Sequence, residues 1–277
     1  MKKVMGGRIR GAGKRWAAPR PFLTFACWLA ALCAMPSALA TDADDLLRAL
    51  QKARAWEARG QVQVTVLFPP RDVPTKMMGK LPVLPLRPGA VVKAFTVVKA
   101  GSETLAGRAV TRFELTPLNV GAARWRLWVD DAWNVPLGFE ERGADGALAR
   151  QALFQKVNAR LVKGQGPSLS VASGLRAAVQ GAVPGLRVPA GFTPVSVQQK
   201  DRRVEVTLSD GLNTLALVLA PRNVKAAPGV ASRQVGGRFV WLVGNLPQEA
   251  LKAALSQVRR VDESALGTFL APAASKP

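Results

Sequence analysis

Residues 124–130 read Arg-Trp-Arg-Leu-Trp-Val-Asp, and this stretch decides the fold. Successive residues of a β-strand point to opposite faces of a sheet, so the seven residues divide into two sets. One set is wholly apolar and consists of Trp125, Leu127 and Val129. The other set is amphipathic and consists of Arg124, Arg126 and Trp128. Such a strand is typical of a sheet that has one face covered by another part of the protein.

Further strand-like segments surround this stretch. They cover residues 97–98, 109–115, 137–141 and 149–157, and turn-forming residues such as Gly143-Ala-Asp-Gly146 separate them. Short strands with short connections favour antiparallel neighbours. The sequence therefore predicts an antiparallel meander that curls over one face of a helix.

The helix is predicted at the start of this unit. Thr41 and Asp44 form a capping-box pattern, and acidic residues in the first turn suit the positive end of the helix dipole. Apolar residues then recur at helical spacing until Gly60, at Leu46, Leu47, Leu50, Ala53 and Trp56. Residues 61–68 alternate between polar and apolar types and predict a half-buried strand.

Residues 69–89 contain six prolines, so we expect no regular structure through most of this segment. Met77, Met78 and the residues from Leu81 to Leu86 are largely apolar, which predicts that the segment packs against something. Packing on its own sheet is the favoured interpretation, because apolar loop residues usually cover their own core. The alternative is a lid over a groove.

The remainder of the chain predicts a second, smaller unit. Residues 163–187 are rich in Gly, Ser, Ala and Pro and predict a linker, with room for a short helix at 175–179. Residues 188–262 predict a small α+β domain with strands at 195–198, 203–208, 214–219 and 238–243, and Ser209-Asp210-Gly211 predicts a tight turn. Asn245 and Gln248 predict the cap of a closing helix, and residues 263–277 predict a disordered tail.

The first 40 residues have the three parts of a secretory signal peptide. Seven basic and no acidic residues precede an apolar run from Phe22 to Met35, and Ala38-Leu39-Ala40 matches a cleavage site. The apolar run is short for a permanent membrane span, which makes an uncleaved anchor the less favoured alternative. The sequence predicts an exported protein, periplasmic or otherwise extracytoplasmic, that begins at residue 41 after cleavage.

Composition argues against catalysis. The chain contains no His and no Tyr, and both of its cysteines, Cys27 and Cys33, lie inside the predicted signal peptide. The commonest general base and the thiol nucleophile are therefore missing after residue 40. We expect a protein that is not an enzyme and that uses no cofactor and no metal.

The chain stays basic after export. Residues 41–277 hold 32 Lys and Arg against 18 Asp and Glu, a formal net charge of +14. Nucleic acid can bind such a surface, but the export signal argues against that partner. Anionic lipid, lipopolysaccharide or an acidic protein segment suits an exported protein better.

Two stretches resemble the RseB/MucB family of periplasmic regulators of sigma factors. The first carries an Ala-Gly-Arg turn at 106–108, Arg-Leu-Trp-Val-Asp at 126–130, Pro136-Leu137 and Asp145-Gly146. The second carries Val188-Pro-Ala-Gly-Phe192, Leu208-Ser-Asp-Gly-Leu212 and Gly244-Asn-Leu-Pro247. Together they cover roughly two thirds of residues 41–277.

The resemblance implies an α+β fold of two domains. The first, residues 41–162, would be an antiparallel half-barrel like that of the lipoprotein carrier LolA, packed on a helix. The second, residues 188–262, would be the small α+β domain. The family has additional strands where this chain has residues 69–89, so we expect a shortened half-barrel.

The resemblance also implies a function. Family members bind the exported part of a membrane-anchored anti-sigma factor and shield it from proteolysis, as negative regulators of an extracytoplasmic stress response. A lipid or a lipopolysaccharide-like ligand is implied as a second partner. The alternative from the helix-plus-sheet pattern is a LolA-like carrier of lipid or lipoprotein in the periplasm.

One group of residues is a candidate binding site. Arg124, Arg126, Trp128 and Trp133 predict a basic and aromatic patch for an acidic peptide or an anionic lipid, because Arg binds anions in bidentate fashion and stacks on Trp. The alternative interpretation places the tryptophans in the core and the arginines on a solvated face. Asp130 and Asp131 are interpreted as a turn, since two adjacent carboxylates fall short of a calcium loop.

Overall fold

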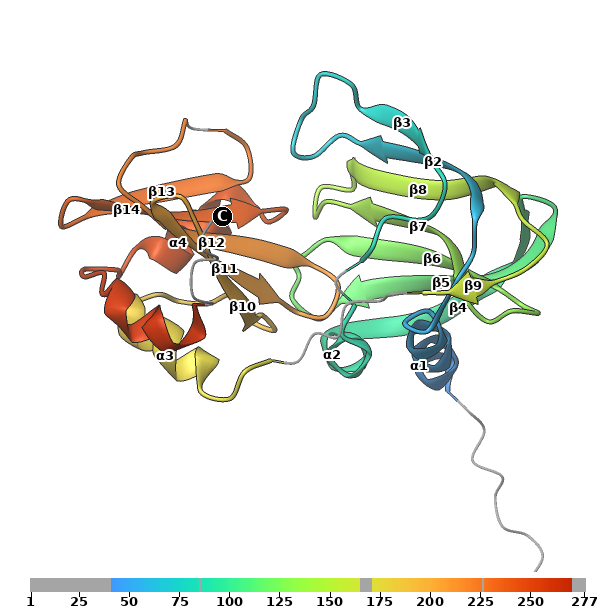
Figure 1. Cartoon of the computed structure of the whole chain (residues 1–277), viewed down its shortest axis with the longest axis horizontal. Helices are drawn as coiled ribbons and strands as arrows, with labels where there is room; N and C mark the ends of the chain where they lie inside the picture. The colour runs from blue at the N-terminus through green and yellow to red at the C-terminus, as the bar shows by residue number, and fades with distance from the viewer. Residues whose placement is uncertain (1–40, 85, 165–170, 226, 271–277) are drawn as a thin grey trace, which may run out of the picture. The chain divides into compact units, whose positions relative to one another are not determined.

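Two large antiparallel sheets, of seven and five strands, make up most of the described chain (Figure 1). The computed structural model describes residues 41–84, 86–164, 171–225 and 227–270. The predicted signal peptide with Cys27 and Cys33 and the last seven residues of the predicted tail lie outside these ranges.

The seven-stranded sheet has the strand order β3-β2-β8-β7-β6-β5-β4. The strands are β2 (Gly60–Val66), β3 (Thr75–Met78), β4 (Phe95–Leu105), β5 (Arg108–Pro117), β6 (Arg124–Asp130), β7 (Pro136–Arg142) and β8 (Leu148–Val157). Strands β4 to β8 follow one another in space as in sequence, which confirms the predicted meander. Strands β3 and β4 stand at opposite edges, so the sheet is an open half-barrel.

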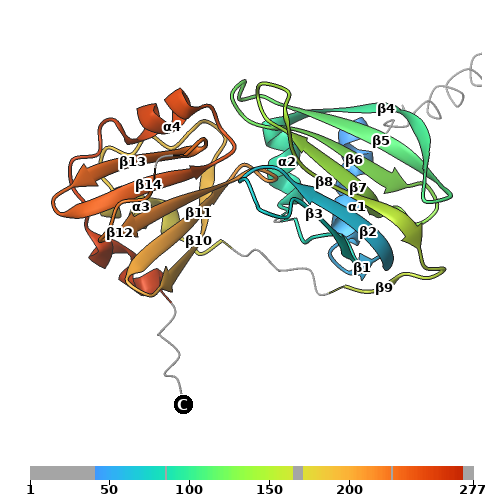
Figure 2. The same ribbon diagram turned by 90° about the horizontal axis from the view of Figure 1, so that it is seen from above.

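Helix α1 (Asp42–Lys52) lies against one face of this sheet (Figure 2). The predicted capping box is present, with Thr41 and Asp44 each accepting a backbone hydrogen bond from the other. Leu46, Ala49 and Leu50 are buried in the same core as Trp125 and the other inward residues of the meander. The predicted extension of this helical face to Trp56 is wrong, because the helix ends at Lys52.

Trp56 lies instead in a two-stranded ribbon. Strand β1 (Trp56–Glu57) pairs with β9 (Val162–Lys163), which ties the end of α1 to the chain that follows the meander.

The proline-rich segment contains more regular structure than its sequence predicts. Strand β3 and the start of helix α2 (Pro88–Ala94) fall inside it. The prolines at 69, 70 and 74 lie before β3, and Pro88 occupies the first turn of α2, where a missing N–H costs nothing. Residues between the two elements pack on the core of the seven-stranded sheet, namely Leu81, Leu84 and Leu86. This is the self-packing arrangement that the sequence favoured.

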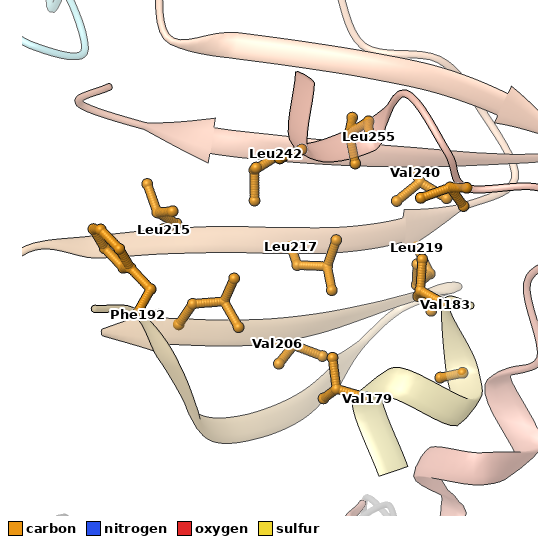
Figure 3. Close-up of a cluster of buried hydrophobic side chains, with 14 of the residues drawn as sticks. Val179, Val183, Phe192, Val206, Leu215, Leu217, Leu219, Val240, Leu242 and Leu255 are labelled. Carbon is orange, nitrogen blue, oxygen red and sulfur yellow. The ribbon is translucent and has the colours of Figure 1, made fainter. Parts of the chain in front are cut away.

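The five-stranded sheet has the order β10-β11-β12-β14-β13. Its strands are β10 (Thr193–Lys200), β11 (Arg203–Ser209), β12 (Thr214–Ala220), β13 (Val230–Val235) and β14 (Arg238–Gly244). One face packs on α3 (Leu175–Ala182) and α4 (Gln248–Leu255) around a core that includes Val179, Leu217 and Leu242 (Figure 3).

Three features of this second sheet differ from the prediction. Strand β13 was not predicted; it joins β14 through Gly236-Gly237, both with positive φ, which is the signature of a tight hairpin. The short helix predicted at 175–179 is present as α3, but it extends to Ala182 and buries Leu175 and Val179, so this part of the expected linker is packed. The segment expected as a disordered tail begins with a 3₁₀ helix, Glu263–Phe269, which buries Leu266.

The predicted cap of the closing helix is also wrong. Helix α4 begins at Gln248 directly after Pro247, without a side-chain cap. The Asn245 side chain reaches Glu141 of the other sheet, where it donates a hydrogen bond of 2.9 Å. Within the described ranges, none of the helices is both long and apolar enough to cross a membrane.

Leu50 and Leu47 of α1 offer a matched test of this packing. Leu50 is 1% exposed against the sheet, whereas Leu47 is only half-buried. Leu50→Ala is expected to lower the free energy of unfolding by about 2–5 kcal/mol, through lost burial and a residual cavity. Leu47→Ala should cost clearly less. Urea unfolding followed by tryptophan fluorescence measures both, and equal losses would contradict the placement of α1.

Candidate functional site: the cleft between the two sheets

The tip of the β11–β12 hairpin, residues 209–213, inserts into the seven-stranded half-barrel. Leu212 is fully buried and belongs to the core of that sheet. Gly211 accepts a backbone hydrogen bond of 3.1 Å from Arg87, just before α2. Gly211 has φ +116°, and a β-carbon on it would lie 2.6 Å from the backbone nitrogen of Val91. Only glycine fits this close approach.

Asn213 connects this hairpin tip to the strand that decides the fold. The indole Nε1 of Trp125 donates a 2.8 Å hydrogen bond to Asn213 Oδ1. Asn213 Nδ2 donates to the carbonyl of Ala123 at 3.3 Å and to Asp210 Oδ2 at 2.8 Å. Every polar atom of the Asn213 side chain is therefore satisfied in a buried position, which holds the hairpin in one orientation.

Asp210 is a buried carboxylate within the same tip. It is 3% exposed, and its Oδ1 accepts backbone hydrogen bonds from Leu212 at 3.1 Å and Asn213 at 2.8 Å. Burial raises the pKa of the Asp210 carboxyl above its ordinary value, because desolvation disfavours the charged form more than the hydrogen bonds from Asn213 and Leu212 favour it.

The contact between the two sheets, formed by residues 209–213 and the residues that they touch, is called the seam below. Glu141 on β7 is the second buried acid at this seam. It is 5% exposed, forms an ion pair with Arg150 and accepts the hydrogen bond from Asn245. The Arg150 guanidinium lies 5.0 Å from the centre of the Trp125 ring, within the range of a cation–π interaction. Trp125, Glu141 and Arg150 thus form one polar layer where the two sheets meet.

A cavity of about 420 Å³ opens beside this layer. Its walls come from both sheets: Val64 and Met78 on one side, Leu215 and Ala216 on the other, with Phe68 and Phe192. The charged residues of its lining are Arg71, Lys76, Arg150 and a single acid, Glu141. Because Glu141 is already paired, the cleft presents apolar walls and a net positive charge to a ligand. Its volume lies within the ordinary range of ligand pockets, about 300–1,000 Å³.

A second pocket lies on the α1 side of the half-barrel. It measures about 110 Å³, and its lining combines apolar side chains such as Leu81, Leu84 and Phe154 with the charged residues Arg54, Glu57 and Lys80. The described cavity at this position is smaller than an ordinary ligand pocket.

The predicted patch is partly brought together. Arg124, Arg126 and Trp128 share the face of β6 opposite Trp125, as predicted. Arg126 forms ion pairs of 3.4 Å with both Glu114 and Glu140. Trp128 Nε1 donates a 2.6 Å hydrogen bond to Glu103. Arg126 and Trp128 therefore already bind acidic side chains on the outer face of the sheet, whereas Arg124 is exposed.

Trp133 belongs to a different cluster. Its ring stacks under the Arg108 guanidinium, 3.6 Å from the ring centre, and Arg108 in turn forms an ion pair with buried Asp130. Asp130 also accepts backbone hydrogen bonds from Ala132 at 3.1 Å and Trp133 at 2.6 Å, so the interpretation of this segment as a turn is confirmed. In the described ranges, no group of three or more acidic, His or Cys side chains is placed to hold a metal ion.

The residues of the seam were missed at the sequence level. Ser209-Asp210-Gly211 indicated a turn, but nothing indicated that the turn enters another sheet. The one available signal was Leu212, a large apolar residue at the tip of a hairpin, where an exposed position would be unfavourable.

Comparisons with known proteins bear on the fold. No family model matches the chain, and no curated protein sequence matches it. Solved structures do match: a crystal structure of MucB superposes with a TM-score of 0.55 at 17% identity, covering 81% of this chain and 98% of that chain. The chain has a MucB-like fold.

Two structures of complexes agree with this result. The Pseudomonas aeruginosa MucA/MucB complex gives a TM-score of 0.53 at 16% identity, covering 80% of this chain and 99% of the matched chain. MucB in complex with MucA(peri) gives 0.53 at 18% identity, covering 80% and 100%. The likeness to MucB therefore spans both sheets, and nearly all of the matched chains has a counterpart here.

Gly211 and Gly237 allow the seam to be tested by matched substitutions. Both have positive φ, but a β-carbon on Gly237 would meet nothing within 4 Å. Gly237→Ala should cost only backbone strain, about 1–3 kcal/mol, whereas Gly211→Ala adds a collision with the backbone of α2. Urea unfolding compares the two variants. Equal losses of stability would show that the hairpin tip does not press against α2.

Asp210 predicts a component of stability that falls as pH rises. Because the pKa of Asp210 is raised, the folded state binds the proton of this carboxyl more tightly than the unfolded state does. The stability that this proton contributes is fully present below about pH 3.8, the ordinary pKa, and is lost as pH rises through the folded-state pKa. Asp210→Asn removes this titration. The free energy of unfolding of the natural chain minus that of the variant should therefore decrease as pH is raised from the acidic side. A flat or rising difference would contradict the assignment.

Proposed function

We propose that this protein is exported to the periplasm and binds the exported part of a membrane-anchored anti-sigma factor, thereby controlling the proteolysis of that partner. The role is binding and not catalysis. Two facts support the proposal together: the MucB-like fold across both sheets, and a cleft of ligand size between them. In two of the matched structures MucB is in complex with MucA.

The lining of the cleft is the observation that carries the proposal. Arg71 and Lys76 contribute positive charge, while Arg150 and the sole lining acid, Glu141, are paired with each other. Apolar walls with a few charged groups suit an extended segment that combines apolar side chains with carboxylates. An acidic stretch of a partner protein has this chemistry. Association would be steered by charge and would weaken as salt rises.

The carrier alternative has less support. A LolA-like carrier needs an apolar cavity for acyl chains in its half-barrel. The pocket on the α1 side of the half-barrel measures about 110 Å³, which is smaller than an ordinary ligand pocket. Lipid as a ligand of the larger cleft stays a prediction. Recovery of lipids with the purified protein would support the carrier function.

The outer-face patch also stays a prediction. Arg124 is its exposed member, while Arg126 and Trp128 would have to give up contacts with Glu114, Glu140 and Glu103 to bind a partner. The substitution Arg124→Glu distinguishes binding at the outer-face patch from binding in the cleft, because it weakens capture of the partner only if the outer face takes part.

Filling the cleft should block the partner. Ala216 of β12 lines the cavity, and Ala216→Trp would occupy it. Ser232→Trp places the same bulk on an exposed position of β13 in the same sheet and serves as the control. The full chain, tagged at its C-terminus so that residues 1–40 are kept, is crosslinked in cells, and the captured proteins and lipids are identified by mass spectrometry.

We expect the natural chain and Ser232→Trp to recover a single-span protein with an exported tail, and Ala216→Trp to lose it. Capture of that protein by all three chains would show that the partner binds outside the cleft. Recovery of lipid or lipoprotein without any such protein would overturn the proposed function.

A further inference from the structure

The hairpin between β2 and β3 exposes an unusual concentration of apolar side chains. Nine large hydrophobic residues are exposed in the described ranges, and three of them lie within residues 67–77. They are Leu67, Val73 and Met77, which are 44%, 73% and 57% exposed. Single exposed apolar residues need no explanation, but three on one hairpin do: Leu67 and Val73 lie in the loop that projects between β2 and β3, and Met77 lies in β3 (Figure 1).

Backbone hydrogen bonds at the base of the hairpin hold it in place. Leu67 and Phe68 both donate backbone hydrogen bonds to the carbonyl of Ala149, at 2.8 and 2.9 Å, and Val66 donates to Pro74 at 2.7 Å. The Phe68 ring packs against Gly229 of the β12–β13 loop, where any β-carbon would collide with it. The exposed side chains are thus presented by an ordered base, which reduces the entropy lost when they bind a surface.

Positive charge accompanies these apolar side chains. Arg71 and Lys76 lie in the hairpin, and Arg222 and Lys225 lie in the β12–β13 loop that Phe68 contacts through Gly229. None of these four cations takes part in an ion pair of the described residues. Asp72 is the one acid of residues 67–77.

The directions of the side chains favour one kind of partner. Met77 pairs with Gln63 and lies on the outer face of the sheet, whereas its neighbour Lys76 pairs with Val64 and lines the cleft. The exposed groups therefore surround the hairpin and do not form one flat face. A protein partner needs a complementary face, while the interfacial region of a bilayer can surround a tip.

We propose that residues 67–77 dock the protein on an anionic phospholipid bilayer. Leu67, Val73 and Met77 would enter the headgroup region, and Arg71, Lys76, Arg222 and Lys225 would lie near the lipid phosphates. This contact shares Arg71 and Lys76 with the lining of the cleft, but its apolar residues Leu67, Val73 and Met77 lie outside that lining, and the proposal does not rest on the proposed function.

The test uses residues 41–277 and vesicles that contain no protein. The vesicles are phosphatidylcholine with phosphatidylglycerol, or phosphatidylcholine alone. Val73→Asp is compared with Val120→Asp, the same substitution at a residue that is 90% exposed in the loop after β5. We expect binding to the anionic vesicles that falls about tenfold in Val73→Asp and is unchanged in Val120→Asp. Equal binding by the two variants, or no binding by the natural chain, would overturn the proposal.

A second measurement reports insertion directly. Both cysteines of the chain precede residue 41, so Val73→Cys and Val120→Cys each carry one site for an environment-sensitive dye. The dye at residue 73 should shift to the blue on anionic vesicles, and the dye at residue 120 should not. Equal binding to neutral vesicles would remove the role of the cations. Loss of self-association in Val73→Asp, without any vesicle binding, would show that the hairpin contacts a second copy.

Discussion

The hydrogen bond from Trp125 to Asn213 joins the two sheets of this protein, and the rest of the structure depends on the seam around it. Trp125 lies on the apolar face of β6, in the middle of the first core, and Asn213 closes the β11–β12 hairpin of the second sheet. Leu212 places its side chain in a core to which the remainder of its own sheet does not contribute. Losing this seam would expose Leu212 and break the hydrogen bonds that join Asn213 to the Trp125 indole and to the carbonyl of Ala123. Both effects carry free-energy costs of about 1–3 kcal/mol for each buried group.

The electrostatics of the chain divide its charges into two classes. The buried acidic side chains of the first sheet are paired with arginines: Glu140 pairs with Arg126 and Arg142, Asp130 with Arg108, and Glu141 with Arg150. Others cap turns or helices, as Asp44 and Asp262 do, and the hydrogen bonds they accept lower the pKa of each carboxyl. The excess of Lys and Arg therefore remains available to anionic partners, so the basic composition is a property of the surface and not of the core.

The sequence predicted what depends on local periodicity. Alternation along 109–115, 124–129 and 149–157 located the strands of the meander, and the resemblance to a known family supplied their arrangement. Strand β13 was missed because Ser232, Arg233 and Gln234 interrupt its apolar pattern, although Gly236-Gly237 marked the hairpin. Helix α2 was missed because prolines dominate the segment before it. The candidate site was mostly missed, since Trp125 and Asn213 are 88 positions apart and only tertiary structure brings them together.

The walls of the cleft come from both sheets, and this shared construction has a thermodynamic consequence. A molecule that fills the space between Val64 and Ala216 must bind both sheets at once. Its binding free energy then adds to the work needed to pull the sheets apart, and the cohesion of the sheets sets how tightly it is held. The two quantities are reciprocally linked. Occupancy of the cleft can therefore be read from the melting temperature of the whole chain, and a destabilised seam would release the bound molecule without any change in the residues that touch it.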